Sequence, residues 1–282
     1  MSSTVNANYS TMKRLSGVEK YLFFWSESEA NQFEFKVSKY PLGNLSSVFV
    51  GCFTYLITIY ILREWIRLRG KPFNLRYVAI VWNWFCSIGS LYLLIKLSEQ
   101  VFDLFSKYSV WSLLCDEGIQ HNHGKHQLIT YIVYLTKYLE LIDTFLLCLR
   151  GKNLQFLHVY HHSVTILFTY IHLQAQTCIM WMVPVLNLSV HVVMYAYFAL
   201  YEMNINCWWK QIVTLMQVTQ FYITLAVGLV VLIPRIIYSI NPGLPGAYAV
   251  SLTVCKYHYF DSLHLLDVIS KQSCVTSLQV YA

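Results

Sequence analysis

Residues 154–174 read LQFLHVYHHSVTILFTYIHLQ, an apolar run that contains three closely spaced histidines. A helix that crosses a bilayer needs about 20 predominantly apolar residues, and ionisable side chains inside one are costly and mark a substrate path or a reaction site. On a helix, His158, His161 and His162 span only about 100° of arc, so all three can face one interior surface. The stretch therefore predicts a membrane helix with a functional polar face.

The composition of the whole chain favours an integral membrane protein. Of its 282 residues, 56% are hydrophobic and only 12% are charged, whereas about 25% of the residues in a typical soluble domain are charged. The net charge of +6 is explained by lysines and arginines in loops at a membrane face, and no basic run is long enough to indicate nucleic-acid binding. The eight cysteines are scattered without a C-x-x-C pair, which argues against a zinc ribbon or a redox motif.

Six stretches have close to the length that a membrane span requires, and a weaker seventh follows. They lie at 44–63, 77–96, 127–149, 154–174, 177–200 and 212–233, with the seventh at 244–260. We therefore predict an all-α integral membrane protein with six or seven transmembrane helices. Its parts are an N-terminal tail over 1–43, a transmembrane domain over 44–240 and an atypical C-terminal segment over 241–282. Pro184, inside the fifth span, is expected to kink that helix.

The distribution of basic residues predicts the orientation of the spans. Five lysines and arginines lie within residues 63–76, directly after the first span. Cytosolic loops are enriched in these residues, so this loop is expected in the cytosol and the N-terminus in the lumen. The sequon Asn8-Tyr-Ser10 would then face the lumen and accept a glycan.

Alternation of the spans places the connections near residues 150 and 205 on one face of the membrane. Measured from that face, polar side chains of the third to sixth spans all lie roughly 6–14 Å deep, because a helix rises about 1.5 Å per residue. Polar groups of four predicted helices thus lie at one depth in the membrane, which predicts a shared site.

Three of these spans carry polar stripes with two interpretations each. The third span has Lys137, Glu140, Asp143 and Thr144 within about 120° of arc, either as a salt-bridged stripe that joins helices or as a shell that orients the histidines and substrate. The fifth and sixth spans place their polar residues at helical spacing, either as interhelical hydrogen-bond partners or as parts of the site. These residues are Asn187, His191, Tyr195, Thr214, Gln217 and Gln220.

On these residues, the chain resembles the fatty-acid elongase family of membrane 3-oxoacyl-CoA synthases. The resemblance covers roughly residues 40–240 and departs from the family over the last 35 or so residues, which end without a dilysine retrieval signal. Four motifs carry it: Lys137-x-x-Glu140-x-x-Asp143-Thr144, His158-x-x-His161-His162, Asn187-x-x-x-His191-x-x-Met194-Tyr195-x-Tyr197 and Thr214-x-x-Gln217-x-x-Gln220.

The resemblance implies a helical barrel around an acyl-chain tunnel and a condensation of a long-chain acyl-CoA with malonyl-CoA. It implies an acyl-imidazole intermediate on His161, with His191 as its partner, while His158 and His162 position groups or exchange protons. No metal and no bound cofactor are expected. Substrate-binding roles follow for Lys137, Glu140, Asp143, Thr144, Asn187, Tyr195, Gln217 and Gln220, and Arg150, Lys152 and Lys210 would meet the CoA phosphates at the cytosolic face.

The same resemblance implies a multi-pass protein of the endoplasmic reticulum membrane. Expected partners are membrane lipid and the ketoacyl reductase, dehydratase and enoyl reductase of the elongation cycle, and a homodimer is an open alternative to a monomer. No nucleic-acid partner is expected.

Two other function classes are alternatives. His-x-x-His-His also suits iron, as in a di-iron membrane desaturase or hydroxylase. Such a site needs several histidine boxes on one face, whereas His121, His123 and His126 belong to the 97–126 loop on the opposite face. In a non-enzymatic seven-span receptor or transporter, the polar layer would instead be a ligand path.

Overall fold

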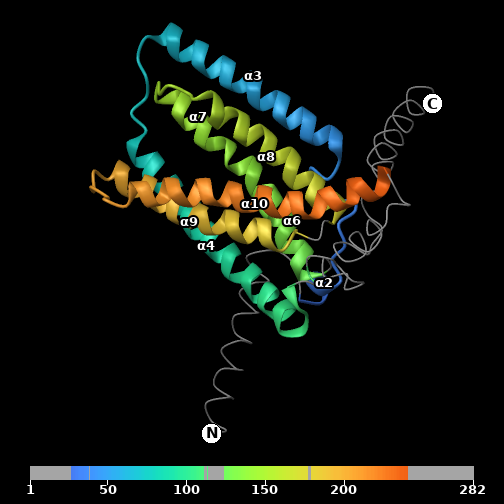
Figure 1. The fold of residues 1–282 in the computed structure, drawn as a ribbon. Coiled ribbons are helices and arrows are strands. Elements are labelled where there is room, and N and C mark those ends of the chain that lie inside the picture. The colour runs from blue at the N-terminus through green and yellow to red at the C-terminus, as the bar shows by residue number, and fades with distance from the viewer. Residues whose placement is uncertain (1–26, 38, 111–112, 114–123, 177–178, 241–282) are drawn as a thin grey trace, which may run out of the picture.

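The computed structural model describes residues 27–37, 39–110, 113, 124–176 and 179–240, and the regular structure of these residues is entirely helical (Figure 1). This confirms the predicted all-α class. The helices are α2 (Glu27–Asn31), α3 (Leu45–Arg69), α4 (Arg76–Lys107), α6 (Lys125–Leu139), α7 (Leu141–Leu149), α8 (Phe156–Ala175), α9 (Met182–Glu202) and α10 (Lys210–Ile240).

Several helices extend beyond the apolar stretches that predicted them. Helix α3 continues to Arg69, where Gly70 ends it with a φ of 71°, a left-handed conformation that glycine adopts without a steric penalty. Helices α3, α4 and α9 and the part of α10 over Lys210–Leu229 are long and apolar enough to cross a membrane by length and composition. The predicted seventh span at 244–260 lies outside the described residues.

The third predicted span is two helices rather than one. Helix α6 ends at Leu139 and α7 begins at Leu141, with Glu140 between them. The amide of Glu140 still donates to the carbonyl of Thr136 at 2.9 Å, and the amide of Asp143 donates to the carbonyl of Glu140 at 3.1 Å. The second bond closes a tighter, i to i+3 turn than an α-helix has. The break thus falls on the acidic residue at the centre of the polar stripe.

The predicted kink at Pro184 is wrong, because the fifth helix starts later than its apolar run. Helix α9 begins at Met182, so Pro184 is its third residue. The first four amides of a helix have no intrahelical acceptor, and proline in the first turn therefore costs no hydrogen bond.

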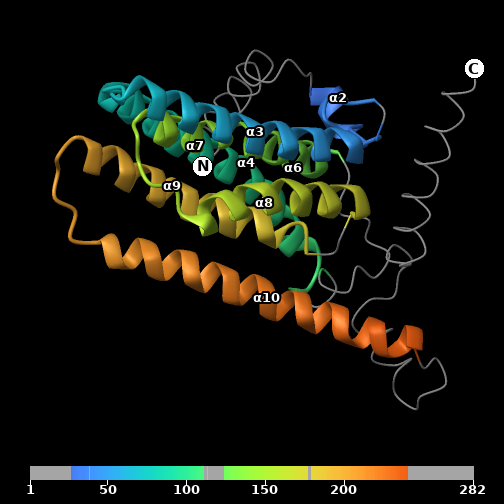
Figure 2. The same ribbon diagram turned by 90° about the horizontal axis from the view of Figure 1, so that it is seen from above.

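Helix α6 forms the centre of the bundle and joins two apolar clusters. On one side, Tyr131 and Tyr134 pack with residues of α3, α7 and α8, and on the other Val133 packs with α4 and α9. The outer helices expose large apolar side chains, as lipid-facing helices do, and α10 runs along one side of the bundle next to α9 (Figure 2).

Residues 33–35 and 40–42, which belong to the predicted N-terminal tail, pack against α6. The amide of Phe35 donates to the Gln127 side-chain oxygen at 2.9 Å, and the hydroxyl of Tyr134 donates to the carbonyl of Leu42 at 2.7 Å. These bonds tie the chain before α3 to the end of α6 that is remote from α7. Closure of the helices into a barrel around a tunnel stays a prediction, because the segment expected to complete it lies outside the described residues.

Candidate functional site

A buried network joins the third and fifth predicted spans. The Lys137 ammonium donates to Glu140 Oε1 and to Asn187 Oδ1, both at 2.7 Å. Lys137 is 3% exposed and Glu140 5% exposed. A buried charge without a partner would be strongly destabilising, so this pairing is what lets both groups remain inside the bundle.

His191 completes this network from the next turn of α9 and is itself buried, with 6% of its surface exposed. Because Asn187 Oδ1 accepts from Lys137, the amide nitrogen of Asn187 is the group that faces His191 Nε2, at 3.2 Å. That nitrogen can only donate, so His191 Nε2 accepts and the proton of the neutral ring lies on Nδ1. His191 Nδ1 is 3.4 Å from Glu140 Oε1. Both polar ends of Asn187 are therefore occupied in orienting His191.

Asp143 links a different pair of helices. Trp82 Nε1 on α4 donates to Asp143 Oδ1 at 2.5 Å, and the Tyr195 hydroxyl on α9 donates to Asp143 Oδ2 at 2.6 Å. Asp143 and Tyr195 were predicted from the sequence as site residues, whereas Trp82 was not. Trp82 lies six residues from the start of α4 at Arg76, so the same depth count applied to the second span would have found it.

The three histidines of α8 lie in contact with one another, as their helical spacing predicts. The ring centroids of His158 and His162 are 4.5 Å apart, and those of His161 and His162 are 5.6 Å apart. Thr144 Oγ1 lies 2.9 Å from His158 Nε2. His162 is buried, and its Nδ1 has no hydrogen-bond partner in the part of the chain that the structure describes.

His161 is the member of this group that faces α10. It is half-buried, and its ring centroid lies 5.8 Å from that of Phe221. Within the described ranges, neither ring nitrogen of His161 takes part in a hydrogen bond to the chain. In this respect His161 differs from His158, whose Nε2 lies at hydrogen-bond distance from Thr144 Oγ1.

Helix α10 contributes less to the network than its polar residues, which were predicted at the same depth as the histidines, suggest. Gln217 donates to the sulfur of Met194 at 3.1 Å, which ties α10 to α9, and Thr214 is exposed and donates to the carbonyl of Lys210 at 3.4 Å. Gln220 is half-buried and makes no hydrogen bond to the residues that the structure describes. The structure thus places these residues beside the site without joining them to its buried centre.

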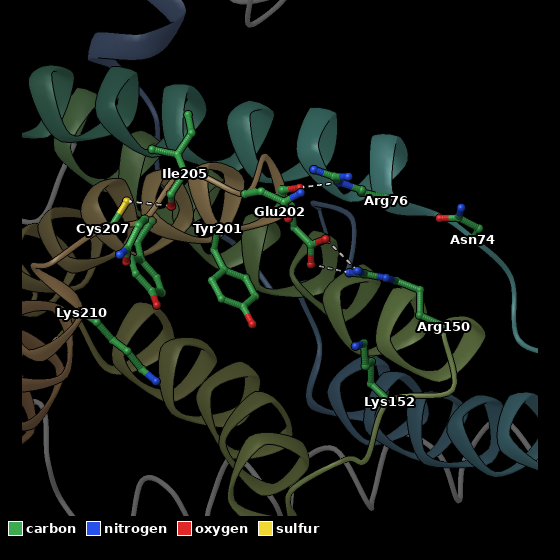
Figure 3. A pocket seen from close by; sticks show the side chains of 12 residues that line it. Asn74, Arg76, Arg150, Lys152, Tyr201, Glu202, Ile205, Cys207 and Lys210 are labelled. Carbon is green, nitrogen blue, oxygen red and sulfur yellow. Dashed lines mark hydrogen bonds and ion pairs between the residues drawn. The ribbon is translucent and has the colours of Figure 1, made fainter.

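An open cleft of about 630 Å³ lies where the helix ends meet at one face of the bundle (Figure 3). Arg150 donates from both terminal nitrogens to the two carboxylate oxygens of Glu202, each at 2.7 Å, and Arg76 Nε donates to the Glu202 carbonyl at 2.6 Å. Glu202 was not singled out from the sequence, where it is an isolated acid at the end of an apolar helix. The lining residues are Asn74, Arg76, Arg150, Lys152, Tyr197, Tyr201, Glu202, Asn204, Ile205, Asn206, Cys207 and Lys210.

The cleft is basic. It brings together Arg150, Lys152 and Lys210, which were expected at one face, and adds Arg76, against the single acid Glu202. Helix α9 connects it to the buried network, since Glu202 lines the cleft while Tyr195 and His191 lie about two and three turns deeper on the same helix. The arrangement suits a ligand with an anionic head outside and a reactive group within.

His126 lies apart from this site. His126 is at the start of α6, at the opposite end of the α6–α7 pair from Arg150, and His121 and His123 lie outside the described residues. Over the ranges that the structure covers, no group of three or more His, Cys, Asp and Glu side chains is arranged to hold a metal ion.

Comparison with known proteins relates the chain to fatty-acid elongases. The model of the ELO family, described as the GNS1/SUR4 family, matches residues 40–279. A Schizosaccharomyces pombe protein named as a candidate fatty acid elongase is 37% identical over 223 residues, covering 78% of this chain and 64% of its own length. "Fatty acid elongase A" of Dictyostelium discoideum is 31% identical over 196 residues, covering 70% of this chain and 71% of its own.

A human relative is more distant. "Very long chain fatty acid elongase 4" is 26% identical over 227 residues, covering 74% of this chain and 66% of that protein. The chain spans a little under two thirds of the length of the two Schizosaccharomyces pombe relatives.

Proposed function

Because this chain belongs to the ELO family of GNS1/SUR4 proteins, we propose that it catalyses the condensing step of fatty-acid elongation. A long-chain acyl-CoA and malonyl-CoA would give a 3-oxoacyl-CoA two carbons longer, CO2 and free CoA. The structure describes a multi-pass helical membrane protein, and we place it in the endoplasmic reticulum membrane, where the ketoacyl reductase, dehydratase and enoyl reductase would act on its product. The condensation itself needs no bound cofactor or metal.

The observation that carries the proposal is that the three histidines on α8 differ in hydrogen bonding and in burial. His158 is held by Thr144 and His162 is buried, whereas His161 is half-buried and makes no hydrogen bond to the described part of the chain. A neutral imidazole is a competent nucleophile toward a thioester. His161 is therefore our candidate for the acylated residue.

The proposed chemistry has two stages. In the first, a nitrogen of His161 attacks the acyl-CoA carbonyl, the carbon–sulfur bond breaks, and the departing CoA thiolate takes the imidazole proton. In the second, malonyl-CoA loses CO2, and the resulting carbanion attacks the acyl carbon and breaks its bond to His161. The imidazole then regains one proton from solvent, which balances the reaction.

The neighbouring residues have distinct parts in this proposal. Asn187 donates to Nε2 of His191 and Glu140 lies next to its Nδ1, so these two residues hold the ring in one orientation through the two stages. Gln217 and Gln220, on the helix that His161 faces, are candidates to hydrogen-bond the thioester oxygens.

The basic cleft supports a binding site for the CoA head group. The phosphates cannot enter the bilayer core, and Arg76, Lys152 and Lys210 offer cationic groups around an open volume. Arg150 is held in place by its two bonds to Glu202. The acyl chain would run from this cleft past His161 and into the bundle.

The activity is tested on membranes that carry the full chain, with labelled acyl-CoAs of several lengths and malonyl-CoA but no reductant. We expect a 3-oxoacyl-CoA product two carbons longer than the substrate. Well-expressed protein that gives no such product with any acyl-CoA would overturn the proposal. Iron analysis of the same protein distinguishes the desaturase alternative, which requires bound iron.

The nucleophile is tested by replacing His161 with Ala. We expect at least a hundredfold loss of condensation, because both stages pass through this imidazole. Incubation with acyl-CoA alone should add the acyl mass to the peptide containing His161 in the wild type but not in the variant. The matched control is His172→Ala on the same helix, whose ring contacts Phe168 rather than the network. Full activity of His161→Ala would contradict the assignment.

A further inference from the structure

A chain of hydrogen bonds reaches the histidines from a helix that none of the sequence motifs includes. Tyr55 lies on α3, which is mostly exposed, yet Tyr55 is 1% exposed and its ring packs 5.9 Å from that of Phe145 on α7. Its hydroxyl lies 2.8 Å from Thr144 Oγ1, and the same oxygen of Thr144 lies 2.9 Å from His158 Nε2. Three helices are thus joined through one buried hydroxyl.

The number of available protons determines the direction of these bonds. If His158 Nε2 donated to Thr144, the hydroxyl proton of either Tyr55 or Thr144 would have no acceptor among the residues that the structure describes. If Tyr55 donates to Thr144 and Thr144 donates to His158 Nε2, every hydroxyl proton has an acceptor. A buried hydroxyl without a partner is costly, so the second direction is favoured.

We propose that Tyr55 is a positioning residue that sets the tautomer of His158 through Thr144. With Nε2 accepting from Thr144, the neutral ring of His158 carries its proton on Nδ1. His158 then acts as an N–H donor at Nδ1 and is not available as a base at Nε2. This inference rests on the proposed condensing activity and adds a residue to it that the family motifs do not contain.

The position of His158 matters because the three rings pack edge to face in series, with His162 between His158 and His161. His158 contacts His162 at 4.5 Å between ring centroids, and His162 contacts His161 at 5.6 Å. A change in the tautomer or tilt of the first ring therefore reaches the proposed nucleophile through direct packing. Tyr55 does not touch the reacting atoms in this account, and its effect is exerted only through Thr144.

The test measures kcat and KM for condensation by the full chain carrying Tyr55→Phe, which removes one oxygen and keeps the packing against Phe145. We expect kcat to fall about tenfold, the effect of one lost neutral hydrogen bond, with KM changed less than about twofold. The control is Tyr60→Phe on the same helix, where Tyr60 is 69% exposed and kcat should not change.

A double-mutant cycle separates this role from a purely structural one. Thr144→Val should lose as much kcat as Tyr55→Phe, and the double variant should lose no more, because both remove the same relay. Thr144→Ser keeps a hydroxyl and should recover most of the kcat that Thr144→Val loses. Each rate is divided by the amount of folded protein, which is measured by thermal unfolding in detergent.

Wild-type kcat in Tyr55→Phe, or losses that multiply in the double variant, would overturn the inference while leaving the condensing activity intact. If Tyr55→Phe does not fold, equal kcat values for Thr144→Val and Thr144→Ser would overturn it instead. An inactive wild-type chain would contradict the proposed function, and this inference would fail with it.

Discussion

At the scale of single residues, the charged groups that the motifs bring into the interior, Lys137, Glu140 and Asp143, all have partners there. Lys137 is neutralised by Glu140 and also bonded to Asn187, and the carboxylate of Asp143 accepts from Trp82 and Tyr195. The interpretation of the third-span stripe as a salt-bridged link between helices is therefore confirmed, and its role in holding substrate stays a prediction. The same bonds that join α6 to α9 also orient His191.

Removing one member of the buried ion pair should destabilise the protein. We expect Lys137→Met to lower the free energy of unfolding by about 3–5 kcal/mol, because it leaves the Glu140 carboxylate buried without its cation. Unfolding in detergent by heat or denaturant measures the change.

The double variant Lys137→Met with Glu140→Gln is the control for that experiment. It removes both charges, so stability should largely return, while condensation should stay low because His191 has lost its carboxylate neighbour. Wild-type stability in Lys137→Met alone would show that the pair is not what keeps these groups inside.

At the scale of helices, the ends that meet at one face are tied together by a single acid. Glu202 at the end of α9 binds Arg150 just after α7 through its carboxylate, and Arg76 at the start of α4 through its carbonyl. A bidentate arginine–carboxylate pair constrains both position and orientation. These bonds hold the cationic groups of the cleft around one volume.

Replacing Arg150 with Ala should weaken the binding of both CoA substrates. We expect KM for acyl-CoA and for malonyl-CoA to rise about tenfold, because the change removes a positive charge from the cleft and leaves the Glu202 carboxylate unpaired next to the phosphates. The kcat should change less than about twofold, because this electrostatic contribution is the same in the ground and transition states. Steady-state kinetics with each substrate varied in turn measures this.

The control for this prediction is Arg67→Ala. Arg67 is exposed, pairs with Glu64 within α3 and does not line the cleft, so its removal should leave both KM values unchanged. Equal KM values in Arg150→Ala and in the wild type would place the CoA head group elsewhere.

At the scale of the whole molecule, the cleft confirms the alternation of the spans. Its lining comes from the connections between α3 and α4, between α7 and α8, and between α9 and α10. These three connections therefore lie at one face, which agrees with the alternation predicted from the sequence. The basic loop over 63–76 leads into this same face, which the charge distribution predicts to be cytosolic.

This orientation predicts a lumenal N-terminus and hence a glycan on Asn8. Expression in cells should give a protein whose electrophoretic mobility increases after treatment with a glycosidase that removes N-linked glycans. Asn8→Gln should remove the shift without affecting condensation. A cytosolic N-terminus, shown by the absence of the glycan together with protease access to the tail in sealed vesicles, would reverse the topology.

The sequence by itself determined the class of the protein and the residues of its polar layer. Apolar runs near the length of a bilayer predict membrane helices whatever their packing, and ionisable residues at helical spacing inside such runs indicate one shared depth. Lys137, Glu140, His191 and the three histidines of α8 are predicted in this way as members of one polar layer. Local pattern was sufficient because each of these signals lies within one helix.

Only the tertiary structure decided which groups meet and which remain free. Trp82 and Tyr55 come from helices without a motif, and Glu202 lies on α9 beyond the residues of its motif. Their side-chain partners lie 52 to 89 residues away in the chain. Hydrogen bonds between helices require specific side chains to lie about 3 Å apart, and helical periodicity sets the face of each residue but not its partner.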